Sequence, residues 1–300
     1  MVKEYSSLIR SGDDEESAQS SGEDAISSLI AVSMSLIVIL ASSITIVYLW
    51  KGEDGFVIER PSSALLSWQM EYMDLIGANN ESLAELNGEG VVVCVVDSGV
   101  DLGHPDLRGV ELRGWRDSIN GIEEPYDDEG HGTAMTGIIV SDGGLDGIAK
   151  GVDLLVAKAI DDEGLGTDGT VSDSVDWCVQ QGADIISLSL GGSQSFGSDF
   201  FTTDELEQSV NDALDSGVFV VSSAGNDGED DDGDVGSPGS VEDVICVGGI
   251  TRSGSIWSGS SEGDNDGRLW PNPILPRSDP DKKPEIVGPG HEVPVLMASG

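Results

Sequence analysis

Runs of apolar residues alternate along residues 89–300 with segments in which apolar residues recur every three or four positions. Five runs are typical of strands buried on both faces of a sheet. They are residues 91–96, 154–160, 185–190, 218–223 and 244–247. Two intervening segments place apolar residues on one helical face. The faces consist of Val171, Val175, Cys178 and Val179, and of Leu206, Val210, Ala213 and Leu214. This alternation predicts an α/β domain, with a parallel β-sheet covered on both faces by helices.

A long uncharged stretch, residues 25–50, precedes this domain. As a helix it would be about 39 Å long at 1.5 Å per residue, which exceeds the roughly 30 Å hydrocarbon core of a bilayer. Tyr48 and Trp50 stand at one end, where interfacial aromatic residues are expected, and Lys51 follows. The stretch therefore predicts one transmembrane helix. A cleaved signal peptide is the alternative, although such a peptide usually has a basic leader and a shorter apolar region.

The flanking segments complete the expected organisation. Residues 1–24 are rich in Ser, Gly, Asp and Glu, which predicts a disordered acidic tail. Residues 51–88 are expected to form a linker with one amphipathic stretch at residues 65–76. The globular domain is expected at residues 89–300. The candidate chemistry of this domain, described below, favours a location outside the cell. We therefore expect the domain outside and the acidic tail in the cytoplasm.

The charge balance is strongly acidic, with 56 Asp and Glu residues against 14 Lys and Arg residues and a formal net charge of −42. Nucleic acid is therefore not an expected partner, because phosphate contacts need clustered basic side chains. Such a charge opposes compaction by self-repulsion unless salt screens it. The composition favours a protein of a salt-adapted organism, and a solvated acidic surface with bound cations is the alternative.

The cysteines Cys94, Cys178 and Cys246 are odd in number and widely spaced, which does not indicate a disulfide framework. Cys94 and Cys246 lie in apolar runs, so we expect buried small hydrophobic residues there. No CxxC pair or Cys/His cluster supports a zinc site.

Three polar residues carry the candidate chemistry. Asp97 directly follows the first apolar run, His131 lies between two glycines, and Asn226 follows the fourth run. The carboxyl ends of parallel strands form one edge of an open sheet, where active sites lie. Taken singly, each has an ordinary interpretation as a turn, capping or structural residue.

Several motifs, taken in chain order over residues 67–298, resemble the subtilisin-like serine peptidases (subtilases, peptidase family S8). The motifs are Asp97-Ser98-Gly99 with Asp101 and His104-Pro105-Asp106-Leu107, then Gly130-His131-Gly132-Thr133, residues 187–192, Ala224-Gly225-Asn226, and residues 283–290. Each motif is weak to moderate alone, but their shared order makes chance similarity an unconvincing explanation.

The resemblance implies a role for each matching residue. Asp97 would orient His131, His131 would act as general base and then general acid, and Asn226 would donate to the oxyanion. Two segments would pair with the backbone of an extended peptide substrate. They are Gly164-Leu165-Gly166 and Ser189-Leu190-Gly191. His104 is expected to be structural.

The resemblance implies no required cofactor and assigns no metal ligand. Calcium as a structural ion is an option, with the acidic run at residues 229–234 as a candidate and a plain acidic surface loop as the alternative. Asp161, Asp162 and Glu163 form a second acidic run of the same kind. A monomer is the default expectation.

The nucleophile of the family lies in a Gly-Thr-Ser motif beyond the Pro-Gly segment. Ser299 is the one candidate by position, but Ala298 precedes it in place of Gly-Thr. We therefore expect the serine beyond Gly300 and a peptidase domain that is incomplete at its carboxyl end. The expected function is a membrane-anchored serine endopeptidase with an Asp-His-Ser triad; the alternative is an inactive peptide-binding module of the same fold.

Overall fold

The computed structural model describes residues 28–45, 61–83, 85–190, 205–228, 235–263 and 282–298. The chain forms two separate units, residues 1–59 and 60–300. The expected acidic tail at residues 1–24, the acidic run at residues 229–234, Gly191 and Ser299 lie outside the described residues.

One apolar helix, Ser28–Thr45, is described in the first unit, with a mean hydropathy of 2.1 and all of its side chains exposed. Its hydroxyl groups donate to backbone carbonyls one turn earlier, as from Ser33 to Leu29 and from Ser43 to Ile39 (2.8 Å each). By length and composition it could cross a membrane, although a signal sequence or a core helix would meet the same criteria. The expected span over residues 25–50 therefore stays a prediction.

The second unit is built on a seven-stranded sheet in the order β2-β3-β1-β4-β5-β6-β7. All described strand pairs are parallel, as the apolar runs predict. The strands are β1 Val92–Asp97, β2 Leu112–Asp117, β3 Asp153–Lys158, β4 Ile185–Leu188, β5 Phe219–Ser223, β6 Ile245–Ile250 and β7 Ile286–Pro289. The expected run at residues 185–190 ends as a strand two residues earlier than its sequence pattern indicates.

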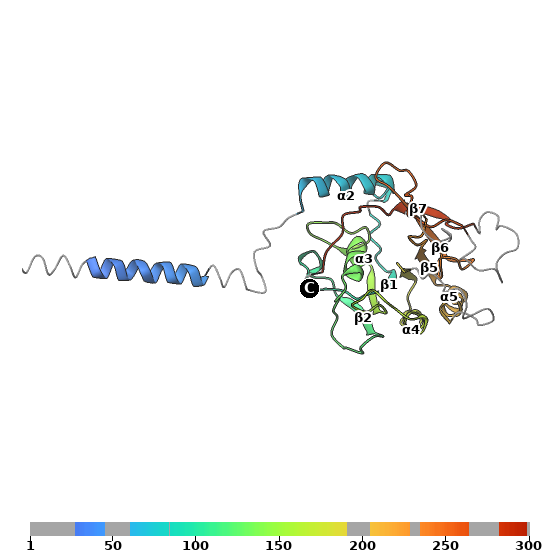
Figure 1. Ribbon diagram of the computed structural model, residues 1–300, viewed down its shortest axis with the longest axis horizontal. Helices are drawn as coiled ribbons and strands as arrows, with labels where there is room; N and C mark the ends of the chain where they lie inside the picture. The colour runs from blue at the N-terminus through green and yellow to red at the C-terminus, as the bar shows by residue number, and fades with distance from the viewer. Residues whose placement is uncertain are drawn as a thin grey trace, which may run out of the picture. The chain divides into compact units, whose positions relative to one another are not determined.

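Alternate side chains of the central strands build a core on each face of the sheet. On one face, Cys94 of β1 and Leu155 of β3 pack with α4 (Asp168–Gln180) and α5 (Glu205–Asp215). The two helices lie side by side (Figure 1). On the other face, Val95 and Val156 pack with α3 (His131–Val140). The fold is a subtilisin-like α/β fold, with the expected parallel sheet flanked by helices.

The helix α2 (Ser63–Leu75) lies inside the segment that the sequence predicts to be a linker. It starts at the N-cap Ser62 and buries Gln69, Tyr72 and Met73. The Gln69 amide donates to Asp146 O (3.1 Å) and accepts from Asp146 N–H (3.1 Å). Burial of the apolar residues and this paired hydrogen bond attach α2 to the compact unit, which therefore begins before residue 89. Two short 3₁₀ helices, η1 (Glu81–Leu83) and η2 (Pro105–Leu107), complete the described helices.

The cysteine prediction is wrong in one respect, because Cys94 and Cys178 form a disulfide between β1 and α4. The two cysteines are 84 positions apart in sequence. They meet because α4 packs directly over β1, and both are fully buried. Cys246 is buried with a free thiol, as expected. Burial raises the pKa of this thiol to about 12, which makes it an unreactive core residue.

Candidate active site

Asp97 is the last residue of β1 and is 1% exposed. Its backbone is fixed by the two residues that follow strand β3, because Asp97 O accepts hydrogen bonds from Ala159 N–H (2.8 Å) and Ile160 N–H (3.3 Å). Its carboxylate oxygen Oδ1 also accepts from Ser98 N–H (2.7 Å). The carboxylate is therefore held at the carboxyl edge of the sheet, where the sequence predicts an active site.

His131 is the first residue of α3, and two glycines place it there. Gly130, the N-cap, has φ = 106°, a left-handed conformation that favours glycine. Gly132 packs against the turn after β1, since a Cβ atom on it would lie 2.2 Å from Gly99 O. This close approach brings the start of α3 to the end of β1.

The side chains of Asp97 and His131 meet directly. His131 Nδ1 lies 2.8 Å from Asp97 Oδ1 and 3.0 Å from Oδ2. With Nδ1–H donating to the carboxylate, Nε2 carries the lone pair that a general base requires. The imidazole is 45% exposed, whereas the carboxylate is 1% exposed. The predicted Asp97–His131 pair thus has the geometry of an oriented base that solvent and substrate can reach.

The environment of His131 stabilises its charged form. The hydrogen bond to Asp97 raises the pKa of His131 above its ordinary value, against the lowering effect of burial, and the negative charges of Asp97, Glu129 and Asp127 add to the rise. Glu129 Oε2 also accepts from His131 N–H (2.7 Å). A positive imidazolium, which forms when the base takes a proton, is therefore favoured here.

Asp127 organises the loop that leads into α3. This buried carboxylate accepts from Ser98 Oγ (2.9 Å), Gly130 N–H (2.8 Å) and Thr133 N–H (2.8 Å) and Oγ1 (2.6 Å). Burial raises its pKa, but the hydrogen bonds from Thr133, Gly130 and Ser98 outweigh that effect and hold the pKa below its ordinary value. Asp127 therefore ties the turn after β1 to the start of α3 as an anion.

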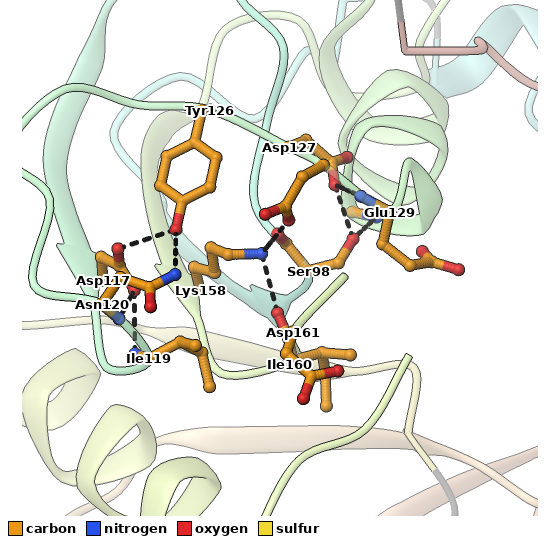
Figure 2. A network of polar contacts seen from close by, with 12 residues as sticks. Ser98, Asp117, Ile119, Asn120, Tyr126, Asp127, Glu129, Lys158, Ile160 and Asp161 are labelled. Atoms are coloured by element: carbon orange, nitrogen blue, oxygen red, sulfur yellow. Dashed lines mark hydrogen bonds and ion pairs between the residues drawn. The ribbon is translucent and has the colours of Figure 1, made fainter. Parts of the chain in front are cut away.

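Lys158, the last residue of β3, lies beneath this loop (Figure 2) and is fully buried. Its ammonium group donates to Asp128 Oδ1 (2.6 Å), Ser98 O (2.6 Å) and Ile160 O (2.8 Å). It also lies 5.0 Å from the centre of the Tyr126 ring. Sequence reasoning missed both Asp127 and Lys158. The one available signal was a lysine inside an apolar run that predicts a buried strand.

The first predicted substrate segment, Gly164-Leu165-Gly166, is a tight turn after β3. Asp161 N–H donates to Leu165 O (2.9 Å), and Asp161 Oδ1 accepts from Leu165 N–H (2.9 Å). Leu165 is 60% exposed, and a Cβ atom on Gly164 would lie 3.9 Å from Glu129 Oε1. Since Glu129 bonds to His131, this turn borders the Asp97–His131 pair.

The other predicted site residues lie further along the same sheet edge. Ser189 and Leu190 directly follow β4, and Leu190 O accepts from Ser223 Oγ (3.1 Å) at the end of β5. Asn226 is exposed three residues beyond β5. The strands β1, β4 and β5 are neighbours in the parallel sheet. The segments that follow them, which carry Asp97, Ser189-Leu190 and Asn226, therefore emerge at the same edge.

The described residues contain no group of three or more His, Cys, Asp or Glu side chains arranged to hold a metal ion. Within the acidic run 161–163, Asp161 Oδ1 is occupied by the N–H groups of Glu163 (3.0 Å) and Leu165. The calcium expectation at residues 229–234 stays a prediction.

Comparison with known proteins assigns the chain to one family. Residues 88–299 match the model of the Subtilase family (Peptidase_S8). Serine protease AprX of Bacillus subtilis (strain 168) is 35% identical over 217 residues, 68% of this chain and 47% of that protein. The intracellular serine protease of Paenibacillus polymyxa is 35% identical over 187 residues, 59% of this chain and 55% of that protein. The chain thus spans about half the length of these two relatives.

A solved structure leads to the same family. A cold adapted subtilisin-like serine proteinase superposes with a TM-score of 0.56 and 27% sequence identity, over 71% of this chain and 68% of that chain. The chain therefore belongs to the subtilisin-like serine peptidases of the Subtilase family.

Proposed function

We propose that this chain supplies the acid–base pair of a serine endopeptidase. The observation that supports the proposal most strongly is the hydrogen bond between His131 Nδ1 and the buried Asp97 carboxylate (2.8 Å) at the carboxyl edge of a subtilase sheet. The nucleophilic serine is proposed to lie in a Gly-Thr-Ser segment beyond Gly300.

In the proposed mechanism, His131 Nε2 takes the serine hydroxyl proton as the serine oxygen attacks the peptide carbonyl. Asp97 stabilises the imidazolium that results. The Asn226 amide donates to the oxyanion of the tetrahedral intermediate. His131 then gives its proton to the leaving amine, and water hydrolyses the acyl-enzyme with His131 again as base.

The substrate is proposed to be an extended peptide that pairs with Gly164-Leu165-Gly166 and Ser189-Leu190-Gly191. The exposed position of this turn beside Glu129 supports contact with the substrate. Backbone pairing would fall to groups other than Leu165 N–H and C=O, because these bond to Asp161. Recognition by added strand pairing reads the main chain of the substrate more than its side chains.

The catalytic proposal is tested by peptide hydrolysis with the product of the whole gene. His131→Ala removes the base, so turnover should fall by several orders of magnitude. His291→Ala, which removes a half-exposed imidazole next to Glu292, is the matched control and should retain wild-type kcat. Retained hydrolysis in His131→Ala would refute the assignment of the base. Absence of hydrolysis from the wild type itself would favour the peptide-binding module.

We also propose that residues 25–50 anchor the protein in a membrane as a single span, with the peptidase domain outside the cell. The satisfied hydroxyl groups of Ser33, Ser35 and Ser43 support this, because a helix in lipid must pair its polar groups internally. Alkaline carbonate extraction should leave the protein in the membrane pellet. Protease added to intact cells should cut the peptidase domain. A soluble product that lacks the amino-terminal residues would indicate a signal peptide instead.

A further inference from the structure

A fully buried lysine lies next to the proposed acid–base pair but outside it. Lys158 has no exposed side-chain surface, and its charge would be costly to bury without partners. Its ammonium group has three N–H bonds, and three oxygens accept them: Asp128 Oδ1, Ser98 O and Ile160 O. The ammonium group is therefore fully satisfied only while these three segments stay together.

Two of those oxygens belong to segments that carry the pair. Ser98 directly follows Asp97, and its N–H donates to the same carboxylate oxygen that faces His131. Asp128 lies in the loop that ends at Gly130, the N-cap of the helix that starts with His131. Lys158 thus bonds on one side to the turn that presents Asp97 and on the other to the loop that presents His131.

Ser98 links the turn after β1 to the loop before α3 and to α3 itself. Its hydroxyl donates to Asp127 (2.9 Å) and accepts from Gly132 N–H (2.8 Å), so one residue contacts both sides of the junction. Lys158 bonds to the carbonyl of this residue, while the two residues after β3 bond to the carbonyl of Asp97. A shift of the Ser98 backbone would therefore move both the Asp97 carboxylate and the start of α3.

We propose that Lys158 is a positioning residue, which holds the Asp97-Ser98 turn against the Asp128 loop and so keeps His131 Nδ1 hydrogen-bonded to Asp97. The proposal rests on the proposed function, in which this pair is the working base. Lys158 is the cross-strand neighbour of Asp97 in the β1–β3 register, but its ammonium group donates to Ser98, Asp128 and Ile160 and to neither side chain of the pair. Its expected effect is on the geometry of the pair, separate from its contribution to the stability of the fold.

The geometry of the pair can be read directly by NMR of the full chain in detergent, with histidine labelled by ¹⁵N. The chain has three histidines, so the spectrum contains three imidazoles, and His104→Gln and His291→Gln assign His131 by elimination. The readouts are the downfield proton on Nδ1 and the titration midpoint of His131. The charged groups that face this imidazole are Asp97 on β1 and Asp127 and Glu129 in the preceding loop.

Lys158→Met keeps an unbranched side chain of similar length and removes all three donors. We expect the downfield proton of His131 to be lost and its titration midpoint to fall, because a hydrogen bond to the charged form is weakened. Removal of the Lys158 charge alone would raise the midpoint, so a fall reports the lost hydrogen bond. Lys150→Met is the matched control, since Lys150 bonds to Asp142 and Asp146 at the surface, and should leave both readouts unchanged. A lower melting temperature with an unchanged His131 proton and midpoint would overturn the proposal.

Asp128→Ala keeps the proposal testable if Lys158→Met does not fold. The Asp128 side chain is 40% exposed, so its removal leaves no large cavity. We expect the downfield proton of His131 to weaken, and an unchanged downfield proton would overturn the proposal. The midpoint is not the readout for this variant, because loss of the Asp128 charge lowers it without any change in geometry. These readouts do not depend on hydrolysis, so a failure of the proposed catalytic function would appear in activity and not in this titration.

Discussion

The Asp97 carboxylate is hydrogen-bonded to the imidazole of His131 and is buried from solvent. Sequence alone predicts Asp97 and His131 as a pair, because each lies in a family motif. It does not predict Lys158 or Asp127, because their partners, Ser98, Asp128 and Thr133, come together only through the sheet register and the loop before α3. A buried polar network depends on contacts between distant segments, which no local pattern in the sequence records.

Asp97→Asn should lower the pKa of His131, because the carboxylate charge and its hydrogen bond are the leading causes that raise it. In the product of the whole gene, kcat should fall by about 10⁴-fold, the magnitude known for other triad peptidases rather than one derived from this chain. Asp153→Asn, which alters an exposed ion pair with Arg113, is the matched control. A titration midpoint of His131 that is unchanged in Asp97→Asn would contradict the pairing.

The raised pKa of His131 also links stability to pH. Because the folded pKa lies above the unfolded value, the protonated pair adds stability that is fully present below the unfolded pKa of about 6.5. That contribution disappears as the pH rises through the folded pKa of His131. Urea unfolding of wild type and His131→Gln should therefore differ most at acidic pH and converge at alkaline pH. A difference that grows with pH has the wrong sign for this account.

The central strands could be predicted from their apolar runs, and the edge strands could not. β2 contains Arg113 and Arg116 and is only partly buried, while β7 exposes Ile286 and Val287. Each strand pairs on one side only in the described sheet, so neither needs a continuous apolar run. The Cys94–Cys178 bridge was also beyond sequence reasoning, because it depends on α4 packing over β1.

The junction between α3 and β1 tolerates no side chain at Gly132. In Gly132→Ala, the new Cβ atom would lie 2.2 Å from Gly99 O and 2.7 Å from Gly99 N, so the backbone must move. We expect a loss of about 1–3 kcal/mol in unfolding free energy and loss of the downfield His131 proton. Gly169→Ala in α4 is the control, because its new Cβ atom would make only ordinary contacts, 3.9 Å from Glu205 Oε2 and Thr167 Oγ1, and alanine favours a helix. Equal stability of the two variants would contradict the close approach.

The disulfide should appear in thiol counts and in stability. Denatured without reductant, the protein should titrate one thiol, that of Cys246, and with reductant three. Replacement of Cys94 and Cys178 by alanine should lower the unfolding free energy by about 2–4 kcal/mol. Cys246→Ala, which removes the free buried thiol, controls for loss of packing alone. Three reactive thiols in the unreduced chain would contradict the bridge.

At the scale of the whole molecule, charge is the dominant feature, and several basic side chains in the described part of the chain pair with carboxylates. Arg252 pairs with Glu71, and buried Lys283 pairs with Glu285 (2.6 Å). With 56 acidic against 14 basic residues, most carboxylates have no basic partner to match them. Their mutual repulsion is the feature of this molecule that salt affects most.

The melting temperature should therefore rise as NaCl increases from about 0.1 M to molar concentrations, over which the Debye length falls from about 10 Å to about 3 Å. A globular protein of small net charge, measured in the same buffers, controls for general salt effects on hydrophobic burial. A melting temperature that stays constant up to molar salt would refute the idea of salt adaptation.

The central claim is that the Asp97–His131 pair activates a serine. A fluorophosphonate probe, applied to the product of the whole gene and located by mass spectrometry, tests it most directly. The account predicts a label on the serine of a Gly-Thr-Ser segment beyond Gly300, and loss of that label in His131→Ala. A folded protein that takes no label, or one labelled equally well without His131, would contradict it.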